Sequence, residues 1–207
     1  MPVFDTALFV QVRYGYLTPP KPVVWPRSLQ PVRECLESAI HMASQIELVD
    51  HALLTSRPQR IRAAYFRASL SELCRIEDVA STLGKPFSFY KSSDPTLHIV
   101  KLLRNYQVHL AATQLSSGQI KVELSEETMS YNSFIAEDVT AHQLRLLRSS
   151  SDYSDHQLDQ LVMLFENEQR RFGVVQLLYF VAKRVEEYTL GRLNPRSKGK
   201  HSSLSIE

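Results

Sequence analysis

Three polar side chains within the segment 104–109 have the residue types and the spacing that suit chemistry on phosphate groups. The segment reads RNYQVH, so Arg104 and Asn105 stand together and His109 follows four residues after the asparagine. An imidazole exchanges protons near neutral pH, and a guanidinium binds phosphate oxygens through paired hydrogen bonds. The arginine-to-histidine spacing recurs in the C-terminal tail without the asparagine, so Asn105 makes the pattern specific.

Apolar residues around this segment recur at helical spacing and predict a helix over residues 95–115. Asp94 followed by proline is a typical start for such a helix. The stripe expected to face the core comprises Ile99, Leu103, Tyr106 and Leu110. Asn105 and His109 are four residues apart and should lie together on one flank of that stripe, with Arg104 on the other flank.

A second, weaker apolar strip is expected on the Arg104 side of the same helix. Its members are Val108, Ala111 and Leu115. A helix that is apolar on two sides usually lies between two partners, either helices of its own fold or a second subunit. In a dimer formed across this helix, Arg104 of each copy would reach toward the shared cleft, and the two asparagine–histidine pairs would meet near the twofold axis.

The R-N-x-x-x-H pattern on a helix of a mainly helical chain resembles the HEPN superfamily, many of whose members are metal-independent ribonucleases. The resemblance rests on Arg104, Asn105 and His109 and on their helical setting. It implies a compact helical bundle that forms a homodimer, with one composite site built from both motifs. It further implies RNA cleavage to a 2′,3′-cyclic phosphate without a cofactor, in stress or defence, with a regulatory protein as a possible partner.

The resemblance also assigns roles to the three side chains. His109 would take the proton from an RNA 2′-hydroxyl or return one to the leaving oxygen. Arg104 would neutralise charge on the phosphoryl oxygens, and Asn105 would orient the phosphate or the imidazole. Toxins of the paired HEPN–nucleotidyltransferase modules often carry a tyrosine two residues after the histidine, where this chain has Ala111. Neutralisation through that tyrosine in a toxin–antitoxin pair is therefore not supported.

The alternative interpretation gives the same residues a structural role. Arg104 would then form an ion pair and His109 a hydrogen bond to the backbone, in a non-catalytic helical module that binds RNA or another protein. The acidic residues considered as partners of the arginine are Glu34, Glu37, Glu47 and Asp50.

A second candidate site is a basic stripe on the helix expected over residues 58–83. Arg57, Arg60 and Arg67 lie close to one face, and the eleven residues 57–67 contain no acid. Such a stripe can follow a phosphate backbone, so these arginines are candidate nucleic-acid-binding residues. The other interpretation is a solvated helix face that pairs with acidic neighbours.

Composition excludes several classes of protein. The formal net charge is +2. The tail 191–207 carries +3, so the body carries −1 and cannot coat DNA by bulk charge. Cys35 and Cys74 fit no zinc spacing, and no other metal-ligand motif is present. The longest apolar stretch, 174–182, is far shorter than a membrane span, and the N-terminus is unlike a signal peptide. These features predict a cytoplasmic protein without metal or cofactor.

The overall pattern predicts a mainly α-helical bundle of about six helices with a small two-stranded β element. The expected helices are 31–54, 58–83, 95–115, 136–148, 154–171 and 173–190. Ser154, with Gln157 three residues later, resembles a capping box, and Gly173 either separates the last two helices or kinks a single one. A strand at 120–124 is expected to pair with an alternating segment within residues 1–17. The expected domains are an N-terminal strand with a proline-rich connector (1–30), a HEPN-like helical domain (31–190) and a basic, flexible tail (191–207).

Overall fold

The computed structural model describes residues 1–6, 24–49, 57–110, 113–124 and 127–193 of the chain. Over these residues the protein is mainly helical with one two-stranded antiparallel sheet, which confirms the predicted fold class. The principal elements are α1 (Gln30–Leu48), α2 (Pro58–Thr82), α3 (Pro95–His109), β1 (Leu115–Leu124), β2 (Glu127–Ala136), α4 (Ala141–Arg145) and α5 (Asp155–Leu193). The last of these five helices is broken in its middle, so the count is close to the six expected.

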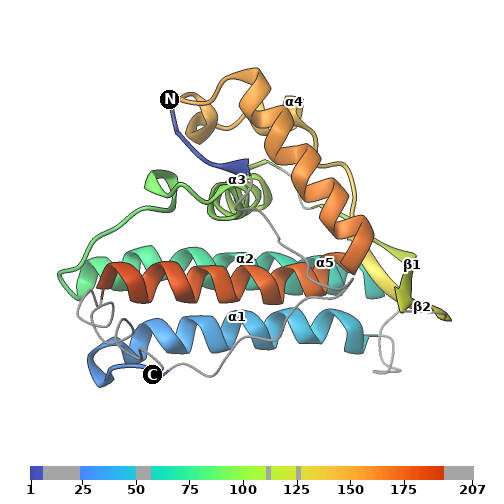
Figure 1. Ribbon diagram of the computed structural model, residues 1–207, viewed down its shortest axis with the longest axis horizontal. Helices are drawn as coiled ribbons and strands as arrows, with labels where there is room; N and C mark the ends of the chain where they lie inside the picture. The colour runs from blue at the N-terminus through green and yellow to red at the C-terminus, as the bar shows by residue number, and fades with distance from the viewer. Residues whose placement is uncertain (7–23, 50–56, 111–112, 125–126, 194–207) are drawn as a thin grey trace, which may run out of the picture.

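The helices form two layers around one core. α1 packs against α2 and α5, and in Figure 1 these helices cross the lower part of the view, with the second half of α5 in red. α3 lies across them, seen nearly end-on, and contacts both α2 and α5. The side chains buried between the layers include Phe66, Leu70, Leu103, Leu177 and Val181. They recur every three or four residues along their helices, which is why the sequence pattern located these elements.

Gly173 separates the two halves of α5. Its φ of 79° and ψ of 157° lie in a region that is almost restricted to glycine, and Figure 1 shows the chain reversing there between the orange and red stretches. A Cβ at this position would lie 1.8 Å from Ser133 Oγ. The predicted separation of two helices at Gly173 is therefore correct, and the close approach of β2 adds a second reason for glycine.

The sheet is a hairpin, and the strand that pairs with β1 differs from the one expected. β1 pairs antiparallel with β2, in a register that places Leu115 opposite Ala136 and Gly118 opposite Ser133. The expected strand 120–124 lies inside β1, but β2 was not predicted, and helix 136–148 was placed immediately after it. Residues 1–6 form no strand, and the remainder of the expected N-terminal strand lies outside the described residues.

Several helix bounds are corrected. α3 ends at His109 instead of 115, and the Gln107 amide then holds the outgoing chain by accepting a hydrogen bond from the Thr113 backbone N–H at 3.0 Å. The helix expected over 136–148 is only α4, which starts late because Thr140 provides its N-cap and Asp138 has a φ of 58°.

The ends of the chain also differ from the expected domain bounds. The first residue of α1 is Gln30, and α5 continues to Leu193, so the regular structure extends beyond Gly191. The end of the helix expected over 31–54, most of the proline-rich connector and residues 194–207 lie outside the described residues.

A buried ion pair ties the start of α3 to α5. The Asp94 carboxylate caps α3 by accepting from the Thr96 backbone N–H at 2.9 Å, and it also accepts from Arg184 at 2.6–2.7 Å. Asp94 is only 7% exposed, so without the arginine its charge would be poorly solvated.

We expect Arg184→Met to lower the free energy of unfolding by about 2–3 kcal/mol, because the Asp94 carboxylate stays buried without its main countercharge. Urea denaturation measures the change. Arg170→Met is the matched control: its ion pair with Glu166 is largely exposed, so the loss should stay below about 1 kcal/mol. Equal losses for the two variants would show that the Asp94 pair has no special weight.

Candidate nucleic-acid interface

α3 brings Arg104 and Asn105 together on the last two turns of the helix. Both side chains are half-buried, and Arg104 Nη1 donates to Asn105 Oδ1 at 3.0 Å. The Asn105 amide nitrogen donates to Tyr90 Oη at 3.2 Å and to Ser149 Oγ at 3.0 Å. Both amide hydrogens of Asn105 are therefore used within the fold. The Arg104 side chain reaches the Asn105 side chain although the two residues lie on different flanks of α3.

His109 is separate from this pair. It is the last residue of α3 and is exposed, and within the described residues it forms no hydrogen bond with Arg104 or Asn105. The Asn105 amide nitrogen donates to Tyr90 and Ser149 and not to His109.

None of the acidic partners considered for Arg104 pairs with it: Glu47 forms no ion pair with it, and Asp50 lies outside the described residues. Glu37 pairs with Arg33 at 2.7 Å, and Glu34 accepts from Gln30. Among residues with described positions, Arg104 forms no salt bridge, and its Nε is buried without a hydrogen-bond partner. The unpaired donor of Arg104 therefore lies inside the fold and does not face solvent.

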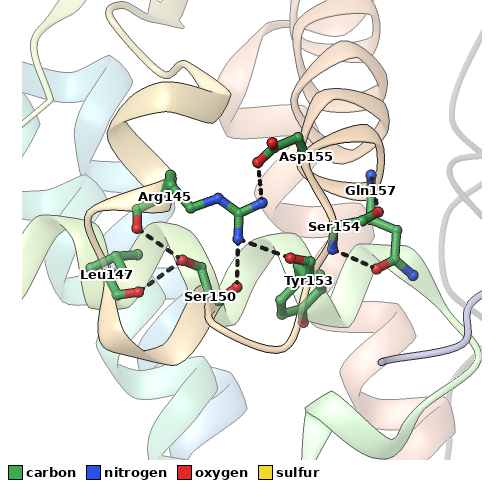
Figure 2. Close-up of polar contacts among 7 residues, drawn as sticks. All are labelled: Arg145, Leu147, Ser150, Tyr153, Ser154, Asp155 and Gln157. Carbon is green, nitrogen blue, oxygen red and sulfur yellow. Dashed lines mark hydrogen bonds and ion pairs between the residues drawn. The ribbon is translucent and has the colours of Figure 1, made fainter.

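A rigid polar support holds the Asn105 partners in place. Figure 2 shows the Arg145 guanidinium donating to the backbone carbonyls of Ser150 at 3.1 Å and Tyr153 at 2.8 Å and pairing with the Asp155 carboxylate. These contacts fix the loop that carries Ser149. The predicted capping box at the start of α5 is confirmed. The Ser154 backbone N–H donates to Gln157 Oε1 at 3.0 Å, and the Gln157 backbone N–H donates to Ser154 Oγ at 3.2 Å.

The second support is a buried aromatic cluster around His98. Its Nε2 lies 2.8 Å from the Ser92 carbonyl, which can only accept, so Nδ1 accepts from Tyr153 Oη at 2.6 Å. Burial lowers the pKa of His98, so the ring is neutral at pH 7. Burial also raises the pKa of Tyr90 to about 12, which keeps its hydroxyl protonated beside Asn105.

The basic stripe forms the wall of a cavity. Arg57, Arg60 and Arg67 all line one open cavity of about 720 Å³ at the start of α2. No acidic residue is among its described lining residues, and Arg60 and Arg67 form no salt bridge within the described part of the chain. Within the described residues, Arg60 and Arg67 therefore have no acidic partner and give this cavity positive charge.

A second cavity of about 470 Å³ lies between the start of α2 and the open end of the hairpin. Gln59 and Gln114 line both cavities, so the two are contiguous. Arg62 belongs to the second one: it is 5% exposed, and its guanidinium lies 4.3 Å from the centre of the Phe134 ring. We call the two cavities the arginine cavity and the hairpin cavity.

Sequence reasoning missed the residues that join these cavities. Gln59 is hidden among the arginines, and Thr113 and Gln114 were assigned to the helix 95–115. No spacing rule identifies them, because their approach to α2 depends on the Gln107–Thr113 contact that turns the chain after α3.

The described residues contain no group of three His, Cys, Asp or Glu that could hold a metal ion, and none of their helices is long and apolar enough to cross a membrane. Cys35 and Cys74 are buried and free, and burial raises the pKa of Cys74 to about 12, so this thiol is unreactive near neutral pH.

Among known proteins, the chain matches no family model, no curated protein and no solved structure.

Proposed function

We propose that this protein binds RNA at the arginine cavity. The proposal is carried by one observation: Arg60 and Arg67 of α2 and the preceding Arg57 line a single cavity whose described lining contains no acid. Guanidinium groups bind phosphate oxygens in a fork geometry, and neutralised phosphates release counterions, which drives binding. The choice of RNA over other polyanions comes from the R-N-x-x-x-H resemblance. A nearly neutral body with one local basic cavity fits a protein that holds a short stretch of strand.

We expect the double variant Arg60→Gln/Arg67→Gln to weaken RNA binding at least about tenfold at moderate salt. The slope of log affinity against log salt should fall by about 0.7 for each arginine removed, because each loses a phosphate contact on a single strand. Fluorescence anisotropy with a labelled RNA oligonucleotide over a salt series measures both quantities.

Arg33→Gln/Arg75→Gln is the matched control, with the same change in net charge on exposed positions outside the cavity. Its affinity and salt slope should stay close to those of the wild type. An equal loss in both double variants would mean that only net charge matters, and the arginine cavity would not be the binding site.

The second candidate function is metal-independent RNA cleavage by Arg104, Asn105 and His109. Two observations favour it: His109 is exposed at the end of α3, and Arg104 of the same helix has a buried Nε without a hydrogen-bond partner. Thr113 lines the arginine cavity and follows His109 by four residues, a reach of at most about 14 Å, so one bound strand can touch both places.

In this second candidate the protein acts as a homodimer. Val108, on the second apolar strip, is 47% exposed and offers an apolar contact to a second copy of α3. Leu110, which was expected in the stripe that faces the core, lies after the end of α3 and is 45% exposed, so it is also available to that contact. The setting proposed with it is the cytoplasm, in stress or defence, with a regulatory protein as a further partner. The dimer would bring two histidines and two arginines to one site.

A further inference from the structure

The two contiguous cavities differ in chemistry: one is basic, as a phosphate requires, and the other is polar and mixed, as a base and its ribose require. The arginine cavity offers guanidinium donors, which suit a phosphate. The hairpin cavity is lined by an amide, hydroxyls, a carboxylate and an arginine stacked on an aromatic ring: Gln114, Ser116, Ser117, Glu137, Arg62 and Phe134. Arg62 and Phe134 are 5% and 8% exposed, so they support the cavity from beneath, whereas Gln114, Ser117 and Glu137 are exposed. Such a mixture of exposed donors and acceptors suits a base edge and a ribose.

We propose that the hairpin cavity receives one unstacked base of a single-stranded RNA whose phosphate lies in the arginine cavity, and that it prefers a base with an exocyclic amino group. This inference rests on the proposed RNA binding. The volumes of the two cavities, about 470 and 720 Å³, fall within the range of small-ligand sites, about 300–1,000 Å³. A base can enter such a site only after leaving its stack, which a single strand permits and a duplex resists.

Glu137 carries the base preference. Its carboxylate is exposed at the rim of the hairpin cavity and has no side-chain hydrogen bond within the described residues. An ionised carboxylate only accepts hydrogen bonds. Adenine and cytosine present an amino group where uracil presents a carbonyl oxygen, so uracil would leave Glu137 unpaired or repelled. Gln59 and Gln114, which line both cavities, can donate and accept and so complete the contacts to the base edge.

The test compares short labelled oligoadenylate, oligocytidylate, oligouridylate and an RNA duplex by fluorescence anisotropy on the full chain, with EDTA present and probe integrity checked on gels. We expect the adenylate and cytidylate probes to bind about tenfold more tightly than the uridylate probe, and the duplex to bind more weakly than the adenylate probe. Glu137→Gln should reduce the adenylate-to-uridylate ratio below about threefold. Asp159→Asn, an exposed acid on α5 with the same change in charge, should leave that ratio unchanged.

The outcomes separate this inference from the function on which it rests. If all probes bind with equal affinity, if the duplex binds as tightly as the single strands, or if Glu137→Gln leaves the ratio intact, the base-binding role of the hairpin cavity is overturned and RNA binding at the arginine cavity stands. If no probe binds, both are overturned.

Discussion

Gly173→Ala is expected to lower the free energy of unfolding by about 4 kcal/mol. The backbone at φ 79° and ψ 157° costs an L-residue about 1–3 kcal/mol, since Cβ meets the chain itself there. The new methyl group would also lie 1.8 Å from Ser133 Oγ and 2.6 Å from Ser133 Cβ, so β2 and α5 must move apart. Overpacking of this kind adds about 1–3 kcal/mol. Urea denaturation followed by circular dichroism measures the loss.

Two other glycines separate the causes. Gly84 has a φ of +70° with nothing within 4 Å of a built Cβ, so Gly84→Ala reports backbone strain alone and should cost about 1 kcal/mol. Gly191 is helical with open space around it, so Gly191→Ala should be neutral or stabilising. Adding Ser133→Gly to Gly173→Ala should recover part of the loss. If Gly173→Ala costs no more than Gly84→Ala, the close packing of β2 against α5 at this point is wrong.

If the second candidate function holds, His109→Ala is expected to lower the rate of RNA cleavage by a factor of about 10²–10⁴. The imidazole would be the general base or acid of the reaction, and an alanine has no proton to exchange. The assay incubates the full chain with mixed RNA and excess EDTA and follows product ends on gels. Cleavage should survive chelation, because the chemistry needs only side chains of the protein.

His41→Ala is the matched control for this experiment. His41 is an exposed histidine on α1, away from α3, so its removal should leave the cleavage rate within about twofold. Cleavage that persists in His109→Ala, or that EDTA removes from the wild type, would contradict a metal-independent reaction at His109 and leave RNA binding as the function.

Two arginines of the candidate site were predictable from the helical period. Arg60 and Arg67 lie seven residues apart on α2 and therefore share a face. Arg57 is the residue before this helix, and the structure places all three arginines on one cavity. Asn105 shows the limit of the same reasoning. Its helix face was correctly placed, but its side chain turns toward Tyr90 and Ser149, which are 15 and 44 residues away in the chain. Helical spacing carries no information about such contacts.

The sequence by itself determined where the long helices lie, the break at Gly173 and the capping box of Ser154, because each depends on residues within about one or two helical turns. The tertiary structure decided three other features: the hairpin β1–β2, the early end of α3 and the contact between the two cavities. Each of these requires a particular contact between distant segments, such as Gly173 against Ser133 or Gln59 near Gln114. Local patterns reflect local free energies, whereas a binding cavity exists only when separate elements pack together.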